Sequence, residues 1–392
     1  MTTLDTTDVV VVGAGLMGSA AARSLAERGH RVVVVERDVA ASARGASHGS
    51  ARIFRYAYPD PFYAGLVPAS RRLYTELETR LGRQLITPTG ALDFGSIRNP
   101  EALAPVLAEV GVEHELLTPE RARDRWPGIA VDTPVLYHEA AGVIDAESTV
   151  LGQLELAKAA GAECLEHWEA VSVRRGQLGW TVTSAGGAQI RAAQVVLAVG
   201  GWMKSVLAGA DLPSSFTGRI PEPLVTQEYA YHFPYADEAA VGEPAPGERT
   251  AWPAFIEKSP EIFTYSLPGG RDAGFRGQKL AEYHAGLTIE DASAQTGLMS
   301  DENRVRVVDY VKRRLPGLVP EPYAETTCLF TMLPNEDFLV DAADGLILAQ
   351  PCSGHGAKFA PLIGELVADQ ADGRDGVPRF AAAAHLDTEA TA

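Results

Sequence analysis

Cysteine is scarce in this chain of 392 residues, which contains only Cys164, Cys328 and Cys352. Three scattered cysteines are too few for a disulfide framework or a tetrahedral metal site, and neither C-x-x-C nor H-x-x-x-H occurs in the sequence. We therefore expect no bound metal. Such sparse cysteine is also typical of a reducing compartment, which predicts a cytoplasmic protein.

Basic residues and long apolar runs are in short supply as well. The 34 Lys and Arg residues are outnumbered by 51 Asp and Glu residues, so the formal net charge is −17. A surplus of negative charge disfavours nucleic acid and anionic membrane surfaces as partners. No run approaches the ~18 apolar residues of a membrane span. The opening MTTLDTTDVVVVGAG lacks the basic region of a signal peptide.

The clearest pattern that is present is a glycine-rich turn between two apolar runs. The run from Asp8 to Val12 is typical of a buried parallel strand. GAGLMG follows, with Gly13, Gly15 and Gly18 in G-x-G-x-x-G spacing, and a second strand-like run ends in Glu36. Such glycines allow a tight turn and close approach of a pyrophosphate, while the acid can bind ribose hydroxyls. The pattern predicts a dinucleotide site and leaves FAD and NAD open.

The segment after Glu36 does not begin another unit of this kind. It reads RDVAASARGASHGSARIFRYAYPDPFY and is rich in small residues, which would let backbone lie against a flat ligand. Arg52 and Arg55 have the i, i+3 spacing of one helix face. Two interpretations stay open: a solvated basic patch, or a pocket in which one arginine holds an anion.

The remaining chain predicts a cofactor domain with a substrate domain threaded through it. GVIDAESTVLGQLELAKAAGAE is helix-like with a polar start at Asp145, and the strands that follow end near Gly200. Later β-like runs broken by Pro and Gly indicate a mostly antiparallel sheet. The expected fold is α/β, with a Rossmann-like cofactor domain over residues 1–60, 140–217 and 326–385 and an inserted α+β substrate domain over residues 61–139 and 218–325.

Four stretches, taken in order, carry a family resemblance. They are VVVGAGLMGSAAARSLAERGHRVVVVER, GASHGSARIFRYAY, GQKLAEYH, and TTCLFTMLPNEDFLVD with CSGHGAKFAP. Together they resemble the FAD-dependent amine oxidases typified by monomeric sarcosine oxidase and N-methyltryptophan oxidase, within the wider DAO family. The similarity extends over nearly the whole chain.

The resemblance implies FAD as cofactor, joined through Cys328 to the flavin 8α methyl, with Cys352 only packing nearby. A lone cysteine in a β-like run is otherwise more often a small buried hydrophobe. The turn of Gly354, His355 and Gly356 would lie against the flavin ring. The other cofactor contacts that the resemblance implies are Gly13, Gly15, Gly18, Glu36, Arg37, Ser47, His48, Val171, Gly200 and Lys358.

The same resemblance implies a set of catalytic residues. Arg52 and Lys358 would together grip a substrate carboxylate. Lys279 would speed the reaction of reduced flavin with O2, because a fixed ammonium favours superoxide as charge develops. His48 would lie near the ring, and Tyr265 would line the substrate cavity.

The sequence also departs from the family pattern. Four residues separate Lys279 from His284, where sarcosine oxidases have three, so the role of His284 is in doubt and Glu282 could intrude on the pocket. Ala51 and Ala357 replace larger residues. Both changes favour a substrate bulkier than sarcosine.

The function expected from these residues is flavin-dependent oxidation of an N-alkyl or cyclic amino acid to an imine, with O2 reduced to hydrogen peroxide. The partners would be the amino acid and O2, with the chain a monomer or small homo-oligomer. Alternatives are a flavin dehydrogenase with another acceptor, an oxidase of a modified amino acid in a biosynthetic pathway, an NAD(P)-linked dehydrogenase, and a non-catalytic flavoprotein.

Overall fold

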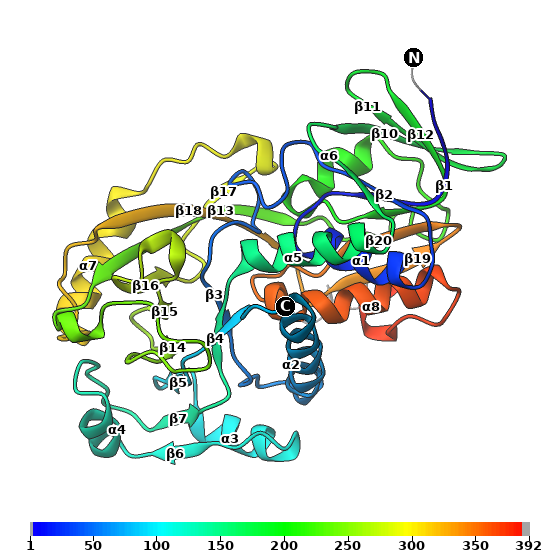
Figure 1. The fold of residues 1–392 in the computed structure, drawn as a ribbon. Helices are drawn as coiled ribbons and strands as arrows, with labels where there is room; N and C mark the ends of the chain where they lie inside the picture. The colour runs from blue at the N-terminus through cyan, green and yellow to red at the C-terminus, as the bar shows by residue number, and fades with distance from the viewer. Residues whose placement is uncertain (1–2, 386–392) are drawn as a thin grey trace.

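Two large sheets organise the chain in the computed structural model, which describes residues 3–385 (Figure 1). The strands of the first sheet are β1 (Thr3–Val12), β2 (Val32–Val35), β9 (Glu163–Leu165), β10 (Ala170–Gly176), β11 (Gly179–Ser184), β12 (Gln189–Leu197), β19 (Leu339–Ala343) and β20 (Leu346–Gln350). Five of them run parallel in the order β9, β2, β1, β12 and β20. β19 is antiparallel to β20, and the β10–β11 hairpin extends β12.

The centre of the first sheet is buried on both faces. The side chains from Val9 to Val12 are at most 5% exposed, and they pair with β2 on one side and β12 on the other. A parallel strand covered on both faces is apolar throughout rather than alternating. This explains the unbroken valine runs of β1 and β2.

Three helices lie side by side over one face of the first sheet: α1 (Leu16–Glu27), α5 (Ala146–Ala159) and α8 (Ala360–Ala371) (Figure 1). α8 approaches α1 closely at Gly364, where a Cβ would lie 2.5 Å from the carbonyl oxygen of Ala20. Asp145 caps α5 by accepting a hydrogen bond from the amide of Ser148 at 2.8 Å, so the predicted helix start is confirmed. α6 (Met203–Ala208) packs near β10.

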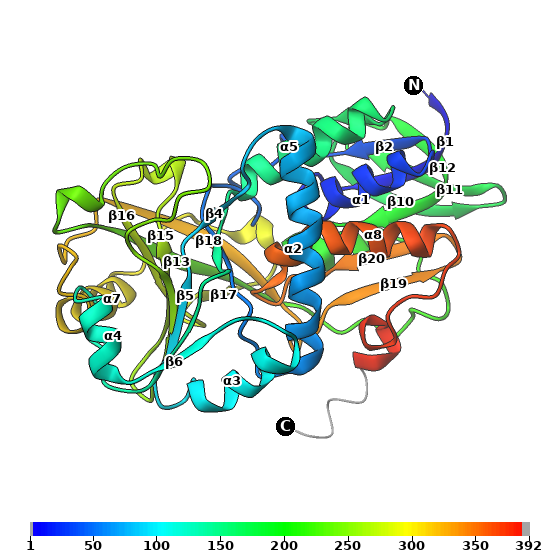
Figure 2. The same ribbon diagram turned by 60° about the horizontal axis from the view of Figure 1, so that its bottom comes forward.

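The second sheet is mostly antiparallel, as predicted. Its strands are β5 (Ala91–Phe94), β6 (Glu115–Leu117), β7 (Val135–His138), β13 (Leu224–Pro234), β14 (Ala254–Lys258), β15 (Phe263–Pro268), β16 (Gly277–Glu282), β17 (Leu287–Ile289) and β18 (Ala324–Met332). Only β5 and β14 pair in parallel. The helices α3 (Pro100–Glu109), α4 (Pro119–Arg125) and α7 (Asp301–Arg314) accompany it, and α2 (Pro61–Leu81) stands between the two large sheets (Figure 2).

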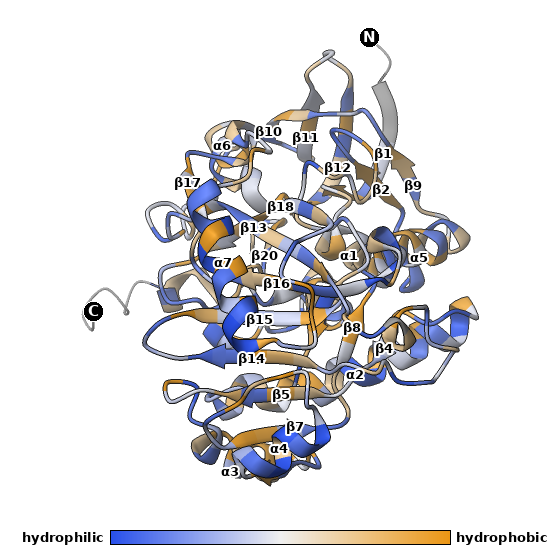
Figure 3. Cartoon of the chain, turned by 90° about the vertical axis from the view of Figure 1, so that its left-hand side faces the viewer, coloured by the Kyte–Doolittle hydropathy of each residue, from blue (hydrophilic) through white to orange (hydrophobic). Residues whose placement is uncertain are grey.

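The two faces of the second sheet differ in chemistry. One face carries Tyr231, Phe233 and Phe255, which pack with Val307 and Tyr310 of α7 in an apolar core. Figure 3 shows α7 coloured mostly hydrophilic, so the helix covers this core while its other side meets solvent. The opposite face of the sheet is turned toward the first sheet and supplies much of the site described below.

A third, small sheet contains Arg52, which the sequence predicted to lie on a helix. It consists of β3 (Arg52–Phe54), β4 (Ile86–Pro88) and β8 (Gly142–Ile144). Arg52 lies in β3 and pairs with Ile144, so the helix face predicted for Arg52 and Arg55 is wrong. The extended ladder to β8 outweighs the helical spacing, because pairing partners far along the chain decide strand formation.

The predicted domain boundary at residue 326 does not coincide with a change of sheet. The last cofactor segment was expected to begin at residue 326, yet β18 pairs with β13 of the second sheet over its whole length. The chain returns to the first sheet only at β19. None of the helices between residues 3 and 385 is long and apolar enough to cross a bilayer.

Candidate functional site

The turn between β1 and α1 has no room for side chains. A Cβ at Gly13 would lie 2.5 Å from the oxygen of Ala198, and one at Gly18 would lie 1.8 Å from the oxygen of Gly13. Gly13 also has φ near +100°, where other residues are strained. A Cβ at Gly15 would meet Ser47 Oγ at 2.9 Å. The start of α1 is therefore bare backbone, suited to a phosphate.

Glu36 is fixed at the end of β2, where the sequence predicts it. One carboxylate oxygen accepts the amide of Ala14 at 2.8 Å, and the other accepts the amide of Asp38 at 3.0 Å. Ser47 Oγ accepts the amide of Leu16 at 3.0 Å. Each carboxylate oxygen has two lone pairs, so Glu36 keeps acceptor capacity for ribose hydroxyls.

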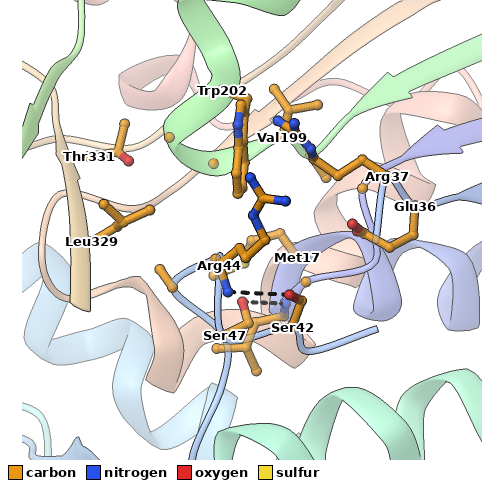
Figure 4. Close-up of a pocket in the computed structure, with 18 of the residues that line it drawn as sticks. Met17, Glu36, Arg37, Ser42, Arg44, Ser47, Val199, Trp202, Leu329 and Thr331 are labelled. Atoms are coloured by element: carbon orange, nitrogen blue, oxygen red, sulfur yellow. Dashed lines mark hydrogen bonds between the residues drawn. The ribbon is translucent and has the colours of Figure 1, made fainter. Parts of the chain in front are cut away.

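A cavity of about 350 Å³ lies beside this turn (Figure 4). The predicted site residues in its wall are Gly13, Gly15, Glu36, Arg37, Ser47, Arg52, Val171, Gly200, Cys328, Gly354 and Gly356. Trp202 belongs to the same wall and was not predicted. The Arg37 guanidinium lies 4.7 Å from its ring centroid, and Figure 4 shows Arg44 close by. The sequence signal for Trp202 was its position directly after Gly200 and Gly201, in the 3₁₀ turn that follows β12.

Cys328 has an unusual thiol. Burial alone would raise its pKa, but Arg52, His48 and Lys279 lower it to about 6. Arg52 Nη2 lies 3.5 Å from the sulfur. His48 Nε2 is buried and forms no hydrogen bond of normal geometry within residues 3–385. Cys352 differs sharply, since burial and the neighbouring Cys328 raise its pKa to about 12. Of these two cysteines, only Cys328 therefore has a pKa low enough for the thiolate to form readily at neutral pH.

Lys279 lies on β16 and is only 6% exposed. Its Nζ is 3.5 Å from the carbonyl oxygen of Ala51, within reach of a weak hydrogen bond. Burial and the nearby Arg52 lower its pKa to about 8, against the opposing effects of Cys328 and Asp272. The lysine thus stays mostly protonated at neutral pH beside the Cys328 thiol.

Strand register places these groups on one face of the second sheet. Cys328 is directly opposite Glu228 of β13, and Lys279 is directly opposite His232 of the same strand. Opposed residues of an antiparallel pair share a face, and so do residues two apart. Tyr265 is on this face as well, since its neighbour Ala281 is two residues from Lys279. Burial raises the pKa of Tyr265, which keeps its phenol neutral.

The surroundings of Lys358 include Arg55, whereas Arg52 was predicted as its partner in binding a carboxylate. The lysine is 2% exposed and donates hydrogen bonds to Tyr58 Oη at 2.9 Å and to the carbonyl oxygen of His355 at 3.0 Å. Arg55 stacks on the Tyr58 ring, 4.3 Å from its centroid. Burial and Arg55 hold the pKa of Lys358 well below its usual range. Arg52 instead contacts Cys328, because residues three apart in an extended segment face opposite ways.

The Gly354–Gly356 turn presents backbone to the cavity, while its histidine points elsewhere. The His355 ring stacks on Phe338 with centroids 4.7 Å apart, and its Nδ1 lies 3.1 Å from Tyr58 Oη. A Cβ at Gly356 would lie 1.8 Å from the oxygen of Pro351. His355 therefore positions the turn. The predicted helix after it is confirmed as a 3₁₀ turn at Gly356–Phe359 followed by α8.

Tyr283, four residues after Lys279, lies at the site. Glu282 turns away and accepts hydrogen bonds from Asn303 and Arg306, so its predicted intrusion does not occur. The ring of Tyr283 lies 5.9 Å from that of Phe330, and its hydroxyl would be 3.1 Å from a Cβ at Gly354. The half-exposed His284 lies at the rim. Tyr58 and Tyr283 were both missed, since nothing local marks them.

Several known proteins resemble this chain over most of its length. Residues 8–370 match the family model described as DAO, FAD dependent oxidoreductase. The chain is 31% identical over 388 residues to monomeric sarcosine oxidase of Streptomyces avermitilis, covering 93% of this chain and 94% of that protein. It is 26% identical over 374 residues to N-methyl-L-tryptophan oxidase of Yersinia pestis, covering 92% and 94%. The solved structure of NikD, described as an unusual amino acid oxidase essential for nikkomycin biosynthesis, has a TM-score of 0.82 and 25% identity, covering 96% of this chain and 98% of NikD.

Proposed function

This chain belongs to the DAO family of FAD-dependent oxidoreductases and acts on CH–NH donors, and we propose that its substrate is a secondary amino acid, either N-alkyl or cyclic. The product is an imine, which water hydrolyses, and the electrons pass to O2 to give hydrogen peroxide. The relatives named as sarcosine and N-methyl-L-tryptophan oxidases support a substrate of this class.

The observation that carries the proposal is a pair of cations without a counter-ion. Lys358 is buried and Arg55 is half-buried, and neither forms an ion pair with an acidic side chain within residues 3–385. Burying an uncompensated charge is costly unless a partner arrives. A substrate carboxylate supplies that partner and favours the charged form of Lys358. An amine without a carboxylate would leave the cost in place.

The cofactor cavity suits FAD. The side-chain-free turn at Gly13 and Gly15 faces the phosphates, and Glu36 stands where the ribose hydroxyls of an ADP half would be. The wall of the cavity also includes Cys328, whose low pKa favours the reactive thiolate. As its sulfur bonds to the flavin 8α methyl, a C–H bond of that methyl would break, the proton would leave, and the two electrons would pass finally to O2. We infer that Cys328 anchors the flavin covalently. When bound, FAD supplies the two-electron acceptor.

The chain's own residues then have separate tasks. Arg55 and Lys358 bind the carboxylate and so fix the position of the neighbouring carbon. Before the flavin is attached, Arg52 favours the thiolate form of Cys328, and it lies within electrostatic range of Lys279. The Lys279 ammonium stabilises the negative charge that develops as O2 is reduced.

The test is anaerobic reduction of the purified holoenzyme. Secondary amino acids should bleach the oxidised flavin, whereas the matched amines that lack a carboxylate should bleach it at least about tenfold more slowly. Admission of air should then yield one hydrogen peroxide per substrate. Equal bleaching by both series would overturn the carboxylate assignment, and reduction without peroxide would replace the oxidase by a dehydrogenase.

A further inference from the structure

A second cavity, of about 370 Å³, adjoins the cofactor cavity, and Phe330 lines both. Its apolar wall includes Phe330, Met332 and Leu333 of β18 and the loop that follows. It lies on the face of the second sheet that carries Cys328 and Lys279. The two cavities therefore share the side chain of Phe330 as part of their walls.

The titratable groups of the second cavity are mainly acidic. Glu222, Glu228 and Glu336 contribute carboxylates, and His284 is the only basic residue in the described wall. Glu222 is exposed and paired with Lys204 at 2.9 Å, while Glu336 is exposed and 3.7 Å from His284. These two acids lie at the rim, where solvent screens them. Of the three acids, only Glu228 is buried.

Glu228 is a buried acid with an incomplete set of partners. It lies in the middle of β13, is 3% exposed and is directly opposite Cys328. Thr226 Oγ1 donates a hydrogen bond to Oε1 at 2.5 Å. The buried Oε2 receives no hydrogen bond of normal geometry from the described residues. Such a carboxyl group destabilises the free protein and is stabilised by a ligand that donates to it.

The surrounding backbone makes room for this acid. A Cβ at Gly286 would lie 2.4 Å from Glu228 Oε1, so a side chain there would displace the carboxyl group. Burial raises the pKa of Glu228, and the amides of Gly286 and Ala285 only partly oppose that effect. An apolar residue would fit this position on the sheet at lower cost. The site therefore holds an acid where packing alone does not require one.

Tyr283 lies near both charged groups of the site. Its ring is 5.9 Å from that of Phe330, which lines the second cavity together with Glu228. Burial raises the pKa of the Tyr283 phenol, and the charges of Glu336, Arg55 and Glu228 act on it as well. The cation at Arg55 and the acid at Glu228 are therefore both close to Tyr283.

We propose that Glu228 is a specificity-determining residue that binds a protonated amino group on the substrate side chain. The preferred substrate class is then a secondary amino acid with a second, basic nitrogen at the far end of its side chain. This inference rests on the proposed function for the placement of the carboxylate. It assigns the second cavity to the side chain of that same substrate.

Binding of inert analogues tests the inference without turnover. The probes are 6-amino-2-(methylthio)hexanoate and 2-(methylthio)hexanoate, in which sulfur replaces the reacting nitrogen and only the first carries a distal ammonium. Titration of the holoenzyme, followed by flavin absorbance, should show at least about tenfold tighter binding of the ammonium compound. Glu228→Gln should bring the two affinities within about twofold.

Two further variants keep the test decisive. Glu336→Gln removes a rim charge on the same cavity and should retain most of the preference. Glu228→Asp keeps the charge with a shorter reach, and it should prefer the ammonium compound less strongly than the unmodified protein but more strongly than Glu228→Gln. Equal affinities in the unmodified protein, or a preference that survives Glu228→Gln, would overturn the inference. Since no amine is oxidised, failure of the proposed catalytic function would appear separately in the bleaching experiment.

Discussion

At Cys328, neighbouring polar groups outweigh the cost of burying a thiolate. With a pKa of about 6, the thiol is mostly ionised at pH 7, and the thiolate is the attacking species in covalent attachment. We expect flavin attachment to flavin-free protein to accelerate from pH 5 to pH 7 and then level off. Acid precipitation at timed intervals, with measurement of flavin in the pellet, gives the rate.

Variants separate the two cysteines and the role of Arg52. Cys328→Ser should release all flavin into the acid supernatant, whereas Cys352→Ser should retain it. Arg52→Gln should move the midpoint of the pH profile upward by about one unit, because a nearby cation stabilises the charged form. Full attachment in Cys328→Ser would refute the assignment of the anchor.

The reoxidation step that Lys279 would assist should depend on pH in the opposite direction. Its pKa is lowered to about 8, so the ammonium is present below that pH and is lost above it. The rate of reoxidation of the reduced enzyme by O2 should therefore fall as pH rises through about 8. Lys279→Met should slow reoxidation about 10²-fold and remove the pH dependence, since one fixed charge at a reacting centre contributes about that much.

A second lysine on the same face of the sheet provides the control. Lys258 of β14 lies 5.6 Å from the Tyr283 ring centroid, and burial lowers its pKa too. Lys258→Met should leave reoxidation within about threefold of the unmodified rate. Stopped-flow mixing with oxygenated buffer measures both variants, and equal losses in the two would show that Lys279 has no special role.

The turn that joins β1 to α1 can form only because its glycines have no side chains. Gly18→Ala would push a methyl group against the oxygen of Gly13, 1.8 Å away, and the obstacle is backbone. We expect α1 to shift from the strand and the purified variant to lose most of its flavin. The ratio of flavin to protein absorbance reports this directly.

Gly29 is the matched control for that substitution. It follows α1 with φ near +91°, and a Cβ there would meet nothing within 4 Å. Gly29→Ala should cost about 1 kcal/mol of unfolding free energy in urea, through its left-handed backbone, and keep its flavin. Loss of flavin in both variants to the same degree would argue against a specific role for the turn.

Elements that depend on local sequence were predicted well, and those that depend on distant partners were not. The β1–α1–β2 unit follows from valine runs, glycine spacing and Glu36 within 29 residues of one another. The strand at Arg52 exists because β8 pairs with it from 90 positions away. Helical spacing was therefore a poor guide there. Likewise, only the register with β13 reveals which sheet contains Cys328.

At the scale of the whole molecule, the site is formed by segments that are far apart in the sequence. The hydrogen bond between Lys358 and Tyr58 spans 300 positions. The family resemblance paired Lys358 with Arg52 at a substrate carboxylate, whereas in the structure Arg55 stacks on the tyrosine that Lys358 contacts and Arg52 contacts Cys328. The burial of Glu228 could not be predicted either, because the sequence around a glutamate in a β-like run does not indicate whether its side chain is buried.

The proposed carboxylate site, a clamp of Arg55 and Lys358, can be tested by determining which arginine binds the substrate carboxylate together with Lys358. Arg55 and Lys358 share Tyr58, whereas Arg52 contacts Cys328. Lys358→Met and Arg55→Gln should each lower kcat/KM for a secondary amino acid about 10²-fold or more, because each leaves a buried carboxylate short of a partner. Both should leave reduction by the matched amine without a carboxylate within about threefold. If Arg52→Gln rather than Arg55→Gln shows that selective loss, the partner of Lys358 is Arg52, and the geometry of the clamp proposed above is wrong.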